Sequence, residues 1–282
     1  MWDPAQYLRF AGERSRPFYE LLARVGAEDP QRVADLGCGP GELTAELAAR
    51  WPAAEVTGLD SSAEMISAAR AHQVSAAVSG RESGSWDTGS AAPAPEAQAG
   101  AFARIRFVLG DLRDWQPAEP HDVIVSNAVL QWLPDHLEVL ARWPKLLARG
   151  GWLAVQVPGN FDQPSHQILR DLAGSPRWRP LLRDVPLNRQ SAEPAQYLDL
   201  LARAGCEVDA WETMYQHVLH GDDPVVEWYK GSGLRPVLAA LDPAQAAEFL
   251  AEYGAETRAA YPRRPYGTVL AFRRVFVVAR AR

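Results

Sequence analysis

The sequence predicts an α/β protein with a mostly parallel seven-stranded sheet, helices on both faces of that sheet and a helical cap. Two observations carry this prediction. Short apolar runs alternate with stretches of helical periodicity through the first two-thirds of the chain, and the first apolar run ends in a glycine-rich turn at residues 37–41. Such alternation is typical of parallel strands joined by helices.

Seven short runs are expected to form the strands. They share aliphatic or β-branched residues and are bounded by glycine, proline or acidic residues, the composition that favours strands. The expected strands cover residues 32–36, 55–60, 106–109, 123–125, 152–157, 207–213 and 274–279.

Helical patterns occupy the stretches between these runs. Apolar residues recur every four positions over Leu43–Trp51, which places them on one helical face. Ser61 and Glu64 have the spacing of a capping box and predict the start of the next helix. A further helix is expected after Asp135, and Gly150-Gly151 is expected to end it.

The domain organisation is predicted from the segments that interrupt the alternation of strands and helices. We expect one domain over residues 1–282, with an N-terminal helical lid at 1–25 and helical cap elements at 161–203 and 222–262. Residues 73–104 are rich in Ala, Ser, Gly and Pro and contain few large apolar residues, so they are expected to form a flexible insertion.

Composition excludes several classes of function. The net charge of −6 disfavours nucleic-acid and membrane-surface partners, which need a basic surface. Two distant cysteines predict no disulfide framework, and neither a signal-peptide pattern nor a long apolar run is present, so a soluble, cytoplasmic protein is expected. His217 and His220 lack nearby cysteines, and no metal site is expected. The oligomeric state is left open.

The glycine turn distinguishes between cofactor classes. Its glycines fall at relative positions 0, 2 and 4 (Gly37, Gly39 and Gly41), whereas a dinucleotide fingerprint needs 0, 2 and 5. Pro40 removes a backbone donor, and Glu42 places a carboxylate that would repel a pyrophosphate at the helix start. The loop therefore favours a ligand without phosphates and disfavours an NAD-dependent dehydrogenase.

Polar residues follow the next three strands. Asp60 ends the second expected strand, where a carboxylate can accept from both hydroxyls of a ribose. Asp111 follows the third strand and could accept from an adenine amino group, and Asn127 follows the fourth. Together these residues offer ribose, adenine and amino-acid contacts but no pyrophosphate site.

The run Asp35–Gly41, followed by Asp60, Asp111 and Asn127, resembles the class I methyltransferases, which have a Rossmann-like fold. In that family the glycine loop holds the amino-acid end of S-adenosylmethionine. Asp35 is equally well explained as a residue that holds the loop, and Cys38 as a small residue filling a tight turn. The resemblance implies cofactor contacts from Asp35, Gly37, Cys38, Gly39, Gly41, Asp60, Ser61, Met65, Asp111, Leu112 and Asn127.

The resemblance extends beyond the cofactor motifs. The stretches similar to the trans-aconitate methyltransferase family are 2–4, 7–10, 13–17, 60–65, 127–134, 156–158, 204–208 and 272–276. This likeness implies methyl transfer to one carboxylate of trans-aconitate, a small tricarboxylate, to give a monomethyl ester. The protein would then be a carboxyl O-methyltransferase with S-adenosyl-L-methionine as cofactor and S-adenosyl-L-homocysteine as product.

The acceptor chemistry predicts the kind of side chain that is needed. A carboxylate is ionised at neutral pH, so no catalytic base is expected. The acceptor's other carboxylates need counter-charges, which arginine supplies with its planar fork. For each arginine a solvated surface position is the alternative, and for the tryptophan a packing role. The substrate candidates are Tyr7, Arg14, Arg16, Trp132, Arg235 and Arg273.

Two alternatives keep the cofactor and change the role. The acceptor could be another small carboxylic acid, which a panel of acids would separate. The chain could also be a non-catalytic, cofactor-binding interaction protein that uses residues 73–104, and it would then bind the cofactor without turnover.

Overall fold

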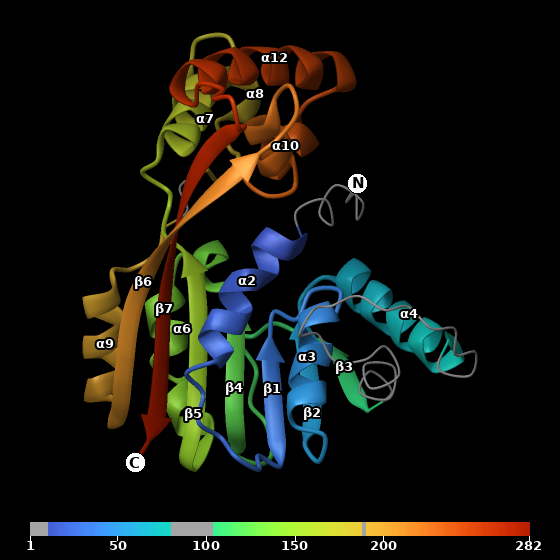
Figure 1. Cartoon of the computed structure of the whole chain (residues 1–282), viewed down its shortest axis with the longest axis vertical. Coiled ribbons are helices and arrows are strands. Elements are labelled where there is room, and N and C mark those ends of the chain that lie inside the picture. The colour runs from blue at the N-terminus through green and yellow to red at the C-terminus, as the bar shows by residue number, and fades with distance from the viewer. Residues whose placement is uncertain (1–10, 80–103, 188–189) are drawn as a thin grey trace. The chain divides into compact units, whose positions relative to one another are not determined.

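A computed structural model describes residues 11–79, 104–187 and 190–282 of the chain (Figure 1). Seven strands form one sheet in the order β3-β2-β1-β4-β5-β7-β6. The expected fold class, a class I methyltransferase sheet with helices on both faces, is confirmed. The strands are β1 (Arg32–Leu36), β2 (Glu55–Asp60), β3 (Ile105–Leu109), β4 (His121–Asn127), β5 (Leu147–Pro158), β6 (Cys206–Leu219) and β7 (Thr268–Ala281).

Five neighbouring strands run in the same direction. Strand β1 pairs in parallel with β2 and β4, β2 pairs with β3, and β4 pairs with β5. Strand β7 runs the opposite way (Figure 1). Because parallel strands share one direction, the carboxyl ends of β1 to β5 lie at the same edge of the sheet, where open α/β sheets bind ligands.

The helices connect these strands and build a separate group late in the chain. Helix α3 packs against β2, and α4 packs against β2 and β3. The helices are α2 (Ala11–Leu22), α3 (Glu42–Arg50), α4 (Ala63–Ser79), α6 (His136–Leu140), α7 (Pro164–Gly174), α8 (Arg179–Leu182), α9 (Pro194–Arg203), α10 (Pro224–Lys230), α11 (Arg235–Ala240) and α12 (Pro243–Ala260), with the 3-10 turns η1 (Leu130–Trp132) and η2 (Trp143–Leu146).

The chain divides into two compact units. The sheet unit contains residues 18–157, 192–211 and 276–282, and the helical unit contains residues 11–17, 158–191 and 212–275 of the described chain. Helix α9 belongs to the sheet unit, although the sequence groups it with the first cap element. A single domain with a lid and a cap stays a prediction.

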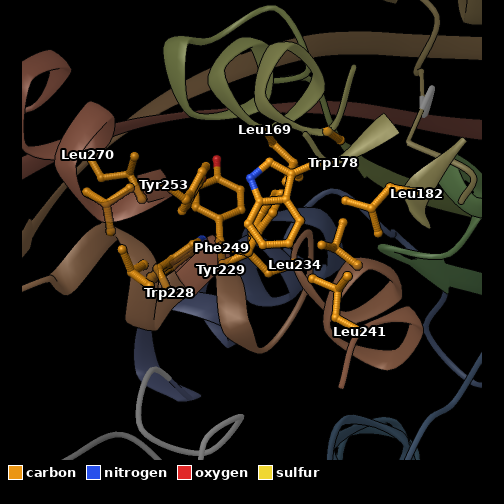
Figure 2. Packing of buried hydrophobic residues seen from close by; sticks show 14 of the residues in the cluster. Leu169, Trp178, Leu182, Trp228, Tyr229, Leu234, Leu241, Phe249, Tyr253 and Leu270 are labelled. Atoms are coloured by element: carbon orange, nitrogen blue, oxygen red, sulfur yellow. The ribbon is translucent and has the colours of Figure 1, made fainter. Parts of the chain in front are cut away.

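Each unit has its own apolar core. In the sheet unit, β1 and β4 are buried along most of their length, and their apolar residues include Val33, Ala34, Val123, Ile124 and Val125. In the helical unit, Trp178 and Phe249 meet edge to face with ring centroids 5.2 Å apart, and Trp228 and Tyr253 belong to the same cluster (Figure 2). Aromatic pairs of this kind contribute about 0.5–1.5 kcal/mol beyond the area they bury.

The helix expected after Asp135 is shorter than predicted. Helix α6 ends at Leu140, and β5 begins at Leu147, so Gly150 lies inside a strand. Pro144 has no N–H to continue a helical ladder. Gly150 adopts a φ of +76°, and the register of β5 against β4 shifts between Leu147 and Trp152, so Gly150 marks an irregularity within a strand and not a helix end.

The start and end of α4 also differ from expectation. Ser62 caps the helix, because its Oγ accepts from the Met65 N–H at 3.2 Å, so the predicted capping box at Ser61 is wrong by one residue. The helix continues to Ser79. Residues 73–79 of the predicted insertion are therefore helical, and residues 80–103 lie outside the described chain.

Candidate functional site

The glycine loop joins β1 to α3 through three left-handed residues. Gly37, Gly39 and Gly41 have φ angles of +87°, +54° and +85°, which disfavour any side chain. A Cβ on Gly37 would lie 2.2 Å from Val129 Cγ2, and one on Gly41 would lie 2.5 Å from Phe107 Cζ. A Cβ on Gly39 would meet no atom within 4 Å. Gly37 and Gly41 are therefore required by packing, whereas Gly39 borders open space.

Asp60 ties this loop to the end of β2. Its Oδ2 accepts from the Gly39 N–H and its Oδ1 from the Ser62 N–H, both at 2.9 Å. The Leu59 carbonyl accepts from the N–H groups of Gly37 and Cys38 at 2.7 and 3.0 Å. A carboxylate has about four acceptor positions, so Asp60 keeps capacity for the two hydroxyls of a ribose.

Asp35 lies in β1 just before the loop, and Cys38 belongs to the loop. Asp35 is 3% exposed and accepts from Thr44 Oγ1 at 2.6 Å, which links β1 to α3. Burial, with the nearby charge of Asp60, raises the pKa of Asp35 to about 6. Burial and the same two carboxylates raise the pKa of the Cys38 thiol, so it stays protonated and fills space. This geometry favours the structural interpretation of both residues.

The residues after β2 and β3 are those predicted to contact the nucleoside end of the cofactor. Ser61 is exposed and Met65 is half-buried, while Leu112 is buried. Asp111 binds Arg113 through Nε at 3.0 and 3.1 Å and through a second guanidinium nitrogen at 2.5 Å. These hydrogen bonds lower the pKa of Asp111. An adenine amino group would share this carboxylate with Arg113.

The end of β4 carries an unused hydrogen-bond acceptor. Asn127 Oδ1 is buried and has no hydrogen-bond partner among the described residues. The next residue, Ala128, has a φ of +57°, a strained value for a residue with a Cβ. Its N–H donates to the Gln156 carbonyl at 2.8 Å, which holds the strained turn in place. Strain and an unused buried acceptor together indicate a ligand site.

Gln156 is a candidate site residue that the sequence analysis does not place among the cofactor or substrate contacts. It is 1% exposed, and both its Oε1 and its Nε2 lack a hydrogen-bond partner within the described chain. Strand register places it beside Asn127. Since side chains alternate along a strand, Asp60, Asn127 and Gln156 share one sheet face with Asp35. The available signal was a polar residue near the end of an otherwise apolar strand.

This row of residues fits the predicted cofactor. Asp60 can accept from ribose hydroxyls, Gly39 leaves room for close approach of a ligand, and Asn127 Oδ1 can accept from an ammonium group. The Gln156 amide can both donate and accept. S-Adenosylmethionine presents these donors and acceptors and carries no phosphate.

The predicted substrate residues meet different surroundings. Tyr7 lies outside the described residues, and Arg14 lies on α2, with its side chain not described. Arg16 places its guanidinium carbon 5.0 Å from the centre of the Tyr215 ring. Arg273 donates from Nε to Glu212 at 2.9 Å, so a carboxylate already engages it.

The remaining two substrate candidates are accessible. Arg235 is exposed at the first turn of α11. Trp132 ends η1 in the sheet unit and is 47% exposed, which disfavours its interpretation as a core residue. The contribution of both to an acceptor site stays a prediction.

No group of three or more His, Cys, Asp or Glu among the described residues could hold a metal ion. Within the described ranges, no helix has the length and apolar character that a bilayer span requires. A cavity of about 270 Å³ in the helical unit is bordered by the Arg258–Asp223 ion pair, and none of the predicted site residues lines it.

Comparisons with known proteins agree with this geometry. Residues 7–210 match the family described as "Methyltransferase domain". The chain is 49% identical over 281 residues to the trans-aconitate 2-methyltransferase of Streptomyces avermitilis, covering 99% of this chain and 96% of the relative. It is 50% identical over 282 residues to that of Rhodococcus jostii, covering 99% of both chains.

Solved structures share the fold at low sequence identity. The YcgJ protein of Bacillus subtilis superposes with a TM-score of 0.55 at 13% identity, over 95% of this chain and 98% of that one. A putative sarcosine dimethylglycine methyltransferase of Galdieria sulphuraria gives a TM-score of 0.55 at 17% identity, over 100% and 92%. The chain therefore belongs to the methyltransferase family and, within it, to the group of the trans-aconitate 2-methyltransferases.

Proposed function

We propose that this protein transfers the methyl group of S-adenosylmethionine to a carboxylate oxygen of trans-aconitate, giving the monomethyl ester. The observation that carries the proposal is full-length similarity: relatives named for this activity are about half identical over 99% of the chain. The row of Asp60, Asn127 and Gln156 beside the open face of Gly39 supports the cofactor assignment.

The chain's own residues supply binding and alignment. Bound S-adenosylmethionine supplies an electrophilic methyl group on a sulfonium. Asp60 would accept from the ribose hydroxyls, and Asn127 Oδ1 from the ammonium of the amino-acid end. Because Asp60 is held by two backbone N–H groups, its orientation is fixed before the cofactor arrives.

The acceptor needs positioning and not deprotonation. A carboxylate is already ionised at neutral pH, and its oxygen is the nucleophile. Catalysis then depends on alignment, on exclusion of water and on cations that hold the other carboxylates. This chemistry requires no general base, and no residue is assigned that role.

A panel of acids tests the acceptor class. The full chain is incubated with S-adenosylmethionine and trans-aconitate, a saturated tricarboxylate, a dicarboxylate or a monocarboxylate, and release of S-adenosylhomocysteine is measured. We expect the highest kcat/KM for trans-aconitate and the lowest for the monocarboxylate. Equal turnover with the monocarboxylate, or no turnover with any acid despite cofactor binding, would overturn the proposal.

A further inference from the structure

The helical unit contains a largely buried group of aromatic and cationic side chains, of which only Arg16 is among the predicted substrate residues. Tyr215 and His217 of β6 stack with ring centroids 5.8 Å apart and planes 9° apart. The His217 ring also stacks on Trp228 of α10 at 4.9 Å and lies 6.1 Å from Phe272 of β7. His217 is 5% exposed. We call His217, Tyr215, Trp228, Phe272, Arg16 and Arg274 the His217 cluster.

Two guanidinium groups complete the cluster. Arg274 is 6% exposed, and its guanidinium carbon lies 4.4 Å from the centre of the Phe272 ring. Arg16 lies 5.0 Å from the centre of the Tyr215 ring and is exposed. Burial, followed by the charges of Arg274 and Arg16, lowers the pKa of His217 to about 4. The imidazole is therefore neutral at neutral pH and lies in a positive potential.

The cluster has a hydrogen-bonding position to fill. His217 Nε2 is buried and has no hydrogen-bond partner in the described part of the chain. Leaving a buried polar atom unsatisfied costs about 1–3 kcal/mol. A neutral imidazole with its proton on Nε2 donates one hydrogen bond, and a guanidinium offers only donors. Donors in a positive potential are complementary to a planar oxyanion such as a carboxylate.

Two consecutive arginines of β7 have different surroundings. Side chains alternate along a strand, so Arg273 and Arg274 point to opposite faces. Arg273 meets the carboxylate of Glu212, whereas Arg274 lies over Phe272 beside the His217 ring. The arginine that the sequence favoured is engaged by an acidic side chain, and its neighbour is the one placed in the cationic cluster.

We propose that the His217 cluster binds a carboxylate of trans-aconitate, with Arg274 and Arg16 supplying charge and His217 a hydrogen bond. This inference rests on the proposed function, because it concerns the same acceptor. It explains how a protein of net charge −6 can select an acid with several carboxylates, because positive charge is concentrated locally and the Arg274 guanidinium is buried. Arg274 and His217 are then specificity-determining residues.

Binding measurements on the full chain test this proposal. Trans-aconitate and a saturated tricarboxylate are titrated by calorimetry in the presence of S-adenosylhomocysteine, which prevents turnover. Loss of a hydrogen bond to a charged group costs about 1.5–3 kcal/mol, so we expect Arg274→Met and His217→Phe each to weaken acid binding about 10- to 100-fold. Arg177→Met is the matched control, because Arg177 also lies over an aromatic ring of the helical unit, 4.8 Å from the centre of the Trp178 ring. It should change binding less than threefold.

Two further readouts keep the test decisive. Each variant must bind S-adenosylhomocysteine as the wild type does. If Arg274→Met fails this check, Arg274→Lys replaces it, and we expect KM for trans-aconitate to rise with kcat little changed. Acid binding should also raise the pKa of His217, measured by NMR of its ring, since a bound carboxylate offsets the charges of Arg274 and Arg16 that face it beside Tyr215.

The outcomes separate this inference from the proposed function. Folded variants of Arg274 and His217 that bind the acids like the wild type would overturn the inference, even if ester forms. Acid binding that is lost in these variants, with no ester formed by the wild type, would support the cluster and overturn the proposed function.

Discussion

Asp35 is a carboxylate held in a place that penalises its charge. It is buried between β1 and α3 and accepts from Thr44, and burial raises its pKa to about 6. The unfolded chain has an ordinary aspartate pKa near 3.9. The folded state therefore binds the carboxyl proton of Asp35 more tightly than the unfolded state does. Protonation of Asp35 stabilises the fold fully below about pH 3.8, and this stabilisation is lost as the pH rises through about 6.

Asp35→Asn removes this pH dependence. The amide keeps an oxygen that can accept from Thr44, so we expect the variant to gain up to ~3 kcal/mol in unfolding free energy over the wild type at pH 8 and little at pH 4. Urea unfolding at pH 4, 6 and 8 measures this difference. Thr44→Val is the control and should lower stability most at pH 8, where the ionised carboxylate needs the hydroxyl. A difference between Asp35→Asn and wild type that does not change with pH would contradict the account.

Gln156 is predicted to oppose stability and support binding. Its buried amide makes no hydrogen bond within the described residues. An apolar side chain of similar shape removes that penalty. We expect Gln156→Met to raise the unfolding free energy of the ligand-free protein by ~1 kcal/mol and to weaken S-adenosylhomocysteine or trans-aconitate binding at least about fivefold.

Denaturant unfolding and calorimetry with each ligand separately test the Gln156 prediction. Gln167→Met serves as a control, since Gln167 donates to the Asp162 carbonyl at an exposed position. A destabilised Gln156→Met that binds both ligands normally would show that the amide has a structural role only.

At the scale of the loop element, two glycines should respond differently to one methyl group. Gly37→Ala places a Cβ against Val129, whereas Gly39→Ala places it in open space. In both variants the alanine must adopt a positive φ, which is strained for a residue with a Cβ. We expect Gly37→Ala to lose at least ~2 kcal/mol of stability and Gly39→Ala about 1 kcal/mol. Gly39→Ala should instead weaken S-adenosylhomocysteine binding more than tenfold. Thermal unfolding and calorimetry separate the two, and equal effects of both substitutions would contradict the assignment of Gly39 to the ligand side.

Element boundaries were predictable where local chemistry sets them. Strand β2 has the predicted bounds of residues 55–60, whereas β4 extends beyond the predicted residues 123–125 to His121 and Asn127. The start of α4 was not predictable from the sequence. Asp60 Oδ1 accepts from the Ser62 N–H, and the helix cap is Ser62 in place of the predicted Ser61. The start of β5 was not predictable either, because its first residues are held by pairing with His121, far away in sequence.

In the molecule as a whole, the cofactor residues and the His217 cluster differ in how well the sequence predicts them. The cofactor residues follow successive strand ends of one sheet, so strand order brings them together and a linear pattern predicts them. The His217 cluster draws on α2, β6, α10 and β7 of the helical unit. No linear pattern joins these segments, and only their packing shows that Arg274 and not Arg273 lies beside His217.

In the proposed reaction, the methyl group moves from S-adenosylmethionine to a carboxylate oxygen of trans-aconitate. The most direct measurement uses cofactor labelled with ¹³C in its methyl group and identifies the product by NMR and mass spectrometry. We predict a single labelled methyl ester, formed in equal amount to S-adenosylhomocysteine, with one regiochemistry. Release of S-adenosylhomocysteine without a labelled ester, or label on another molecule, would contradict the account.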